Sequence, residues 1–502
     1  MFESAEMRHE VNQKTYDKDI ETLREALLDA QYEMLDDKSF PVIVLVNGVD
    51  GAGKGETVNL LQEWLDPRHV RSTAFGAPTE AERLRPPMWR FWSALPPKGK
   101  IGVLFGSWYT NPINERVESR TDDRGLDVEL EAIRHFEQVL VDDGTVLVKL
   151  WFHLSKKAQK KRLKELEADK LTRWRVTKAD WASFEKYDRF RRVSAHALRE
   201  TSTGAAPWLV IDGANEKYRT LTVGRALLAA IRGRLGATPK SKTNGKATGA
   251  RAMPASAVSM LNTIDTTGLL KNLDYSRALQ KDDYKKRLKR AQETLGRLSR
   301  HRGMQKHSIV LVFEGMDAGG KGGAIRRITQ AIDARMYHVI PIAAPTEEER
   351  AQPYLWRFWR QVPRLGRFVI FDRSWYGRVL VERVEGFATE DAWSRAYREI
   401  NEFEEQLSQS GYVVAKFWLA VTKEEQMKRF KEREATKRKQ FKITAEDWRN
   451  RKKWDDYVVA ASDMIDRTST AYAPWTTVEA NDKYYARVKV LETLTQRLKD
   501  TF

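Results

Sequence analysis

The sequence of 502 residues contains no cysteine. This absence excludes disulfide bonds, thiolate metal sites and cysteine nucleophiles, and it is compatible with a reducing compartment. No stretch approaches the roughly 18 apolar residues of a membrane-spanning helix. The N-terminal segment MFESAEMRHEVNQKTYDKD also lacks the apolar centre of a signal peptide. We therefore expect a cytoplasmic protein without a membrane partner.

The sequence has an excess of positive charge. Lys and Arg together number 88 and Asp and Glu 70, which gives a formal net charge of +18. Such an excess favours a polyanionic partner, and nucleic acid, anionic lipid and a phosphate polymer all fit it. A chain of this length exceeds one compact core of ordinary size, so two or more domains are expected.

The sequence contains a long internal repeat. VIVLVNGVDGAGKGE at residues 42–56 matches IVLVFEGMDAGGKGG at residues 309–323, and the offset of 267 residues continues without a gap. It pairs two copies each of APTE, WRFW and SWY. A register kept over this length indicates a tandem duplication of one domain.

The segment between the two copies differs in composition. Residues 233–257, GRLGATPKSKTNGKATGARAMPASA, are rich in small and polar residues without apolar periodicity, which is typical of a flexible linker. We predict an N-terminal domain at residues 1–232 and a C-terminal domain at residues 258–502, each of plausible size for a single domain.

Apolar runs alternate with amphipathic stretches in the second copy. The expected strands are SIVLVFE, HVIPIAA, FVIFD, VVAKFWLAV and TTVEA. This alternation predicts an α/β fold in which each domain has a five-stranded parallel sheet covered by helices. Ligands of such sheets bind beyond the carboxyl ends of the strands.

A glycine-rich loop follows the first expected strand of the second copy. GMDAGGKGG matches the P-loop pattern G-x-x-x-x-G-K, in which backbone N–H groups surround a phosphate at a helix N-terminus. A tight turn without a ligand is the alternative. The candidate phosphate-binding residues are Gly315, Gly319, Gly320, Gly322 and, as a catalytic cation, Lys321. Gly322 stands where the usual Ser or Thr would bind Mg²⁺.

Two acids and two arginines lie near this loop. Asp317 is inside it, and Asp372 ends the strand FVIFD. Carboxylates are ligands that Mg²⁺ prefers, so we assign both to a metal site and to orientation of the substrate. Arg373 and Arg378 follow in FDRSWYGR, where guanidinium groups can grip phosphate oxygens during phosphoryl transfer. An Asp–Arg surface pair is the alternative.

Residues 427–457 form a basic stretch with two expected helical segments around KRKQFKIT. A solvated helix pair is one interpretation. Beside a P-loop, the stretch is also where a helical lid would close over phosphates. The lid candidates are Arg433, Lys437 and Arg438. Further cations that could line a channel for a polymer are Arg326, Arg327, Arg357 and Lys439, with ordinary surface charge as the alternative.

In combination, these motifs resemble the polyphosphate kinase 2 family. The resemblance covers nearly the whole chain and rests on GMDAGGKGG, APTEEER, LWRFW, FDRSWYGRVLVERVEG and the basic stretch. It implies P-loop kinase domains with a lid, inorganic polyphosphate as phosphoryl donor, Mg²⁺ and assembly into homo-oligomers. The tandem arrangement resembles the members that convert AMP to ADP. The implied roles are Asp317 and Asp372 as the acidic pair, Lys321, Arg373 and Arg378 on the phosphates, and Arg433 as the lid arginine.

The first copy departs from this pattern where the chemistry is expected. It keeps Asp50 and Lys54, yet Phe105, Gly106, Asn111 and Leu166 stand opposite Asp372, Arg373, Arg378 and Arg433. We therefore predict that the N-terminal domain is degenerate and non-catalytic.

Two other functions fit parts of the sequence. An ATP-dependent nucleoside monophosphate kinase would use a similar fold and similar residues. A polyanion-binding protein without catalysis would use the basic stretch alone. The sequence has no nucleic-acid-binding module or aromatic RNA-binding signature, so we expect no nucleic acid partner.

Overall fold

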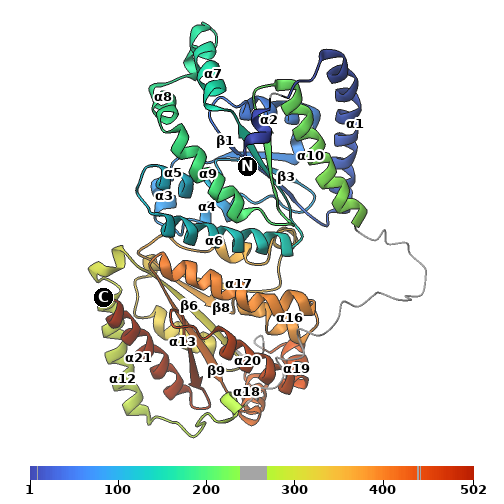
Figure 1. Cartoon of the computed structure of the whole chain (residues 1–502). Coiled ribbons are helices and arrows are strands. Elements are labelled where there is room, and N and C mark those ends of the chain that lie inside the picture. Colours follow the sequence, from blue (N-terminus) through green and yellow to red (C-terminus); the bar gives the residue numbers. More distant parts are fainter. Residues whose placement is uncertain (8, 238–267, 438–439, 441–442) are drawn as a thin grey trace, which may run out of the picture. The chain divides into compact units, whose positions relative to one another are not determined.

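The computed structural model describes residues 1–7, 9–237, 268–437, 440 and 443–502 (Figure 1). Two of the expected lid and channel cations, Arg438 and Lys439, lie outside the described residues. The chain divides into two compact units. Unit 1 comprises Met1–Pro78, Arg90–Gly245 and Thr346–Trp356, and unit 2 comprises Thr79–Trp89, Lys246–Pro345 and Arg357–Phe502.

Each unit contains one five-stranded parallel sheet, as the sequence predicts. The strand order is β2-β3-β1-β4-β5 in unit 1 and β7-β8-β6-β9-β10 in unit 2, so the two copies share one topology. The strands are β1 Val42–Gly48, β2 Val70–Ala74, β3 Ile101–Phe105, β4 Val146–His153, β5 Trp208–Asp212, β6 Ser308–Gly315, β7 Tyr337–Pro341, β8 Phe368–Asp372, β9 Tyr412–Ala420 and β10 Trp475–Glu479.

The central strands are largely apolar because helices cover both faces of each sheet. In unit 1, α1, α2 and α10 pack together, and α5, α6 and α9 form a second group; in unit 2 the corresponding groups are α12 with α13 and α21, and α16 with α17 and α20 (Figure 1). The larger helices of these groups are α1 Gln13–Asp37, α2 Lys54–Trp64, α5 Thr110–Val117, α6 Asp123–Asp142, α9 Tyr187–Thr201, α10 Glu216–Ala237, α12 Lys281–Leu298, α13 Lys321–Thr329, α17 Glu390–Gln409, α20 Trp454–Thr468 and α21 Lys483–Thr501.

The remaining helices are short or lie in the connections between strands. They are α3 Glu80–Arg83, α4 Trp89–Trp92, α7 Lys156–Ala168, α8 Lys178–Glu185, α11 Gly268–Lys271, α14 Glu347–Arg350, α15 Trp356–Trp359, α16 Val381–Val384, α18 Lys423–Ala435 and α19 Ala445–Lys452. Among the described residues, none of the helices has the length and apolar character needed to cross a membrane.

Helix α10 extends into the segment expected to be a linker. It ends at Ala237, so residues 233–237 are helical, and residues 238–257 of that segment lie outside the described residues.

The repeated Ser-Trp-Tyr motif is tied to a buried ion pair in each unit. In unit 2, Trp375 Nε1 and Tyr376 OH both donate to Glu404 Oε1, at 3.0 and 2.7 Å. Lys416 Nζ donates to Glu404 Oε2 at 2.6 Å, and both side chains are fully buried. A buried carboxylate needs such partners, because an unpaired charge in the interior is costly.

The same network recurs in unit 1. Trp108 and Tyr109 donate to Glu137, which pairs with Lys149 at 2.7 Å. The motif is therefore kept in both copies for folding, and the residues around it are free to differ.

Candidate active site

The glycine-rich loop of unit 2 lies between β6 and α13. Gly315 has φ +142°, and a Cβ there would meet the Leu419 carbonyl oxygen at 2.4 Å, so only glycine fits. Gly320 has φ +108° and is the N-cap of α13, which begins at Lys321. Lys321 Nζ turns back and donates to the Gly315 carbonyl at 2.7 Å. The ammonium group therefore lies inside the loop, as in a P-loop.

Two residues of α18 hold the loop in place. Gln426 Nε2 donates to the Asp317 carbonyl at 3.0 Å, and the buried Arg429 donates to the Ala318 carbonyl at 2.9 Å. Arg429 also donates to the Ala480 carbonyl after β10, at 2.6 Å. The sequence does not single out either residue. Arg429 is one of many arginines in a basic stretch, and Gln426 belongs to no motif.

Strand pairing brings Asp372 and Arg373 to the same edge of the sheet as the loop. Phe313 of β6 lies opposite Asp372 of β8. Arg373 then adopts φ +65°, the left-handed region that non-glycine residues rarely occupy. Its guanidinium donates to Asp317 Oδ1 at 3.0 Å, while Asn450 Nδ2 from α19 donates to Asp317 Oδ2 at 2.9 Å. Asn450 is a further site residue that the sequence analysis missed.

A basic cavity of about 740 Å³ opens beyond this edge. Most of the predicted site residues line it, together with Arg327, an expected channel cation, and Arg487, which the sequence does not indicate. The predicted residues that line it are Asp317, Gly319, Gly320, Lys321, Gly322, Arg326, Asp372, Arg373 and Arg433. Arg487, on α21, is far from every motif in the sequence. Six cationic side chains and four carboxylates line the cavity, so positive charge is in excess by two, which suits a chain of phosphates.

Four predicted residues are placed elsewhere or line a different cavity. Arg378 pairs with Glu382, with Nε and Oε2 2.7 Å apart, and Arg357 donates to the Ala343 carbonyl at 2.9 Å. Lys437 is exposed just after α18. None of these three is among the described residues that line the basic cavity. Gly315 lines a smaller neighbouring cavity.

That smaller cavity, of about 60 Å³, lies on the other side of Asp317 and Arg373. Its walls include Trp418, Trp454 and Tyr457. Aromatic side chains are surfaces on which a nucleotide base can stack, but the cavity is smaller than the roughly 300 Å³ at which ligand pockets begin.

A buried acid, Glu314, separates the loop from the start of the Ser-Trp-Tyr turn. It accepts a hydrogen bond from Ser374 Oγ at 2.8 Å, and burial raises the pKa of its carboxyl. Burial, followed by the nearby charge of Arg373, lowers the pKa of Lys321. The sequence does contain a sign of Glu314, because the two copies differ there: an acid in the second copy stands opposite Asn47 in the first.

The acids fit a metal that is shared with substrate. Within the described part of the chain, no cluster of three or more His, Cys, Asp or Glu residues forms a complete protein cage for a metal ion. Asp317 and Asp372 nevertheless line one cavity. One or two carboxylates together with substrate phosphates are a usual set of Mg²⁺ ligands.

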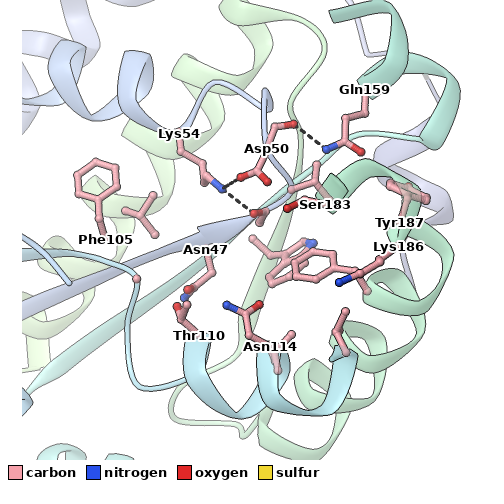
Figure 2. Close-up of a pocket in the computed structure, with 18 of the residues that line it drawn as sticks. Asn47, Asp50, Lys54, Phe105, Thr110, Asn114, Gln159, Ser183, Lys186 and Tyr187 are labelled. Carbon is pink, nitrogen blue, oxygen red and sulfur yellow. Dashed lines mark hydrogen bonds and ion pairs between the residues drawn. The ribbon is translucent and has the colours of Figure 1, made fainter. Parts of the chain in front are cut away.

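The equivalent loop of unit 1 keeps its Asp and Lys, whereas the charges that follow β8 in unit 2 are absent after β3. Lys54 Nζ donates to the Gly48 carbonyl at 2.6 Å and lies 3.5 Å from Asp50 (Figure 2). Gly106 has φ +65°, the same angle as its counterpart Arg373. A neighbouring carboxylate, Glu56, pairs with three arginines, which are Arg162 at 3.2 Å, Arg175 at 3.3 Å and Arg219 at 3.1 Å.

Comparison with known proteins agrees with this duplicated site. Two curated proteins named polyphosphate:AMP phosphotransferase are similar along the chain. That of Pseudomonas aeruginosa is 53% identical over 502 residues, which are 100% of this chain and 99% of the relative. That of Acinetobacter johnsonii is 38% identical over 480 residues, covering 94% and 95%. A crystal structure described as putative polyphosphate kinase 2 from Pseudomonas aeruginosa matches with a TM-score of 0.89 and 52% identity, covering 100% and 99%.

The family model of polyphosphate kinase 2 matches the chain twice, at residues 10–238 and 278–501. Each match contains one sheet and one glycine-rich loop. The chain therefore belongs to the polyphosphate kinase 2 family, of which it carries two copies in tandem.

Proposed function

We propose that this protein transfers the terminal phosphoryl group of inorganic polyphosphate to AMP, giving ADP, and that the C-terminal unit performs the transfer. The observation that carries this proposal is the basic cavity, in which Lys321, Arg373 and Arg433 face two carboxylates at the ends of β6 and β8. The names of the full-length relatives support the choice of donor and acceptor.

The donor occupies the basic cavity in this proposal. Its terminal phosphoryl group lies over the loop amides at the N-terminus of α13, where Lys321 neutralises charge. Arg326, Arg327 and Arg487 hold the following phosphates of the polymer, and Arg433 approaches from α18. Mg²⁺, held by Asp317 and Asp372 together with substrate oxygens, would neutralise the phosphates when bound.

The base of the acceptor stacks on the aromatic walls of the smaller cavity, which at about 60 Å³ has to widen to admit it, and its phosphate meets the donor near Arg373. A phosphate oxygen of AMP is already ionised at neutral pH and needs little general-base assistance. It attacks the terminal phosphorus of the polymer, forming the new P–O bond as the bond to the shortened polymer breaks. Positioning and electrostatic stabilisation then supply most of the rate. Arg378 keeps its proposed role on the phosphates only if it leaves Glu382 when substrate binds.

Product analysis tests the proposal. The full chain is incubated with Mg²⁺, polyphosphate and a panel of AMP, GMP, ADP and GDP, with ATP as the alternative donor. We expect ADP from AMP and polyphosphate without ATP. Formation of ADP only when ATP is the donor would overturn the choice of donor, and salt-sensitive binding of duplex DNA without any transfer would overturn catalysis.

Because its acceptor is a nucleotide of the cell interior, we place the activity in the cytoplasm. Homo-oligomeric assembly and the absence of a nucleic acid partner stay predictions.

A further inference from the structure

Unit 1 contains a cavity of about 350 Å³ beside its glycine-rich loop (Figure 2). Pockets that hold small ligands begin at about 300 Å³. The walls combine aromatic and aliphatic side chains with a similar number of polar and charged ones. The aromatic members are Phe105, Trp151, Tyr187 and Phe190, and the uncharged polar members include Asn47, Thr110, Asn114 and Ser183.

This cavity is the counterpart of the small aromatic cavity in unit 2. With the offset of 267 residues, Trp151, Tyr187 and Phe190 stand where Trp418, Trp454 and Tyr457 line the other copy. The volume is about 350 Å³ in unit 1 and about 60 Å³ in unit 2. Three lining positions carry a smaller side chain in unit 1, namely Gly106 for Arg373, Ser183 for Asn450 and Tyr187 for Trp454.

The charged groups of this cavity are paired. Lys54 lies 3.5 Å from Asp50, and Lys186 Nζ lies 2.6 Å from both carboxylate oxygens of Glu118. With two cations and two acids, the lining has no excess charge. It suits a ligand with an uncharged aromatic body and at most one small anionic group, which Lys54 could meet by leaving Asp50.

The amides supply the directional contacts. Asn47 Nδ2 donates to Ser107 Oγ at 2.9 Å, which fixes its orientation. Asn114 of α5 lines the same cavity as Asn47 and Thr110 (Figure 2). Side-chain amides offer both a donor and an acceptor, the combination needed to pair with the edge of a nucleobase.

Two lining residues also have unsatisfied polar atoms. Trp151 Nε1 and Gln159 Oε1 are buried without a hydrogen-bond partner among the described residues. In unit 2 the counterpart of Gln159, Gln426, accepts from Arg451 at 2.9 Å, but Phe184 replaces that arginine in unit 1. Such atoms cost about 1–3 kcal/mol each, so a polar ligand that reaches them is favoured.

The side of the loop where unit 2 accepts polyphosphate is closed in unit 1. A Cβ on Gly53 would meet the Arg219 guanidinium carbon at 2.2 Å, whereas the nearest side-chain atom to the same position on Gly320 lies at 3.9 Å. Glu56 pairs with Arg219 and with its two neighbours, so three guanidinium groups share one carboxylate. The Arg219 side chain therefore fills the space over the loop that stays open in unit 2.

We propose that unit 1 binds a nucleoside, with or without a single phosphate, in this cavity and does not transfer phosphate to it. The base lies among Trp151, Tyr187 and Phe190, and Asn47 and Asn114 contact its polar edge. The site is distinct from the acceptor cavity of unit 2, so the full chain holds two such ligands.

Equilibrium dialysis of the full chain with adenosine and with AMP, without polyphosphate, tests this. Two matched variants fill one cavity each. Thr110→Trp blocks unit 1, and Gly377→Trp, at the same register, blocks unit 2. For at least one of the two ligands, we expect two sites in the unmodified chain, one in each variant and none in the double variant. Binding of AMP but not adenosine would assign the phosphate to Lys54, and Lys54→Met should then weaken the site of unit 1 at least tenfold.

Thermal unfolding shows whether a variant is folded, and Asn114→Leu gives a second variant that removes an amide without adding bulk. A Gly377→Trp chain that is folded and binds neither ligand would overturn the proposal. So would a stoichiometry that Thr110→Trp and Asn114→Leu both leave unchanged. Equilibrium dialysis needs no catalysis, so its result can be interpreted even if the proposed transfer reaction does not occur.

Discussion

Arg373 is the residue that separates the two copies most clearly. Its backbone has φ +65°, and so does that of Gly106 in the other copy. Glycine adopts this angle freely, whereas a residue with a Cβ pays roughly 1–3 kcal/mol for such a conformation. Unit 2 keeps an arginine at a position where folding favours glycine. Such strain is typical of functional sites and agrees with placing the transfer in unit 2.

A matched pair of substitutions tests the arginine of α18. Arg433→Ala removes a cation that lines the basic cavity, so kcat with polyphosphate should fall by about 10²–10³-fold. Leu166→Ala changes the corresponding position of unit 1, which lines neither described cavity of the active site. Steady-state kinetics should show less than about a twofold change for it, and equal losses in the two variants would place catalysis in both units.

The ionisation of Lys321 gives a pH dependence. Its pKa is lowered by burial, then by the charge of Arg373, and its proton must be present to neutralise phosphate. The alkaline limb of kcat/KM, which reports the free enzyme, should therefore fall at a lower pH than an ordinary lysine allows.

Arginine stays protonated throughout this range. Lys321→Arg should accordingly move the alkaline limb to higher pH, even if the maximal rate is lower. If the alkaline limb of the pH–rate profile does not move in this variant, the limb reports the ionisation of a group other than Lys321.

At the scale of the element, the turn after β3 and β8 is held by a buried network. Glu404 connects the tryptophan and tyrosine of this turn in unit 2 to Lys416 of β9. Burial raises the pKa of Glu404 and lowers that of Lys416, so each charge depends on the other. The network places Asp372 and Arg373 through the turn that follows β8.

Breaking this pair should destabilise unit 2 strongly. Glu404→Gln leaves Lys416 buried without its counter-charge, so we expect a loss of about 3–5 kcal/mol in the free energy of unfolding. Urea denaturation measures it. Glu492→Gln breaks the exposed pair with Arg287 and should cost less than about 1 kcal/mol. The double variant Glu404→Leu with Lys416→Met should recover much of the loss, and a single variant as stable as the unmodified chain would contradict the role of the pair.

The elements also show what a sequence can and cannot reveal. The strand Phe368–Asp372 is predicted with its observed bounds, because four apolar residues in a row are followed by Asp372 and have charged residues on either side. The P-loop and most of its acids and arginines are predicted as well, since they lie at strand ends. Arg487 and Asn450 are not, because only tertiary packing brings α21 and α19 to the loop. Arg378 pairs with Glu382, one helical turn away, and its role on the phosphates stays a prediction.

At the scale of the molecule, a net charge of +18 is distributed over a chain in which one of the two loops lies in a basic cavity. Screening by salt should therefore weaken the binding of a long polymer more than the binding of a single nucleotide. The Debye length falls from about 10 Å at 0.1 M salt to about 3 Å at 1 M. Between these concentrations of KCl, the KM for long polyphosphate should rise more steeply than the KM for AMP. An equal rise in the two constants would show that the charge beyond the site takes no part in holding the donor.

Glu56 gives unit 1 a counter-ion that cannot diffuse away. A dissolved anion competes for arginines only in proportion to its concentration, but a carboxylate of the same chain is always present beside Arg162, Arg175 and Arg219. Raising the supply of polymer therefore does little to displace it. A duplicated enzyme risks holding its donor on a surface where nothing reacts. If unit 2 performs the transfer as proposed, this internal carboxylate competes with the polymer for the three arginines of unit 1 and leaves more of the polymer for unit 2.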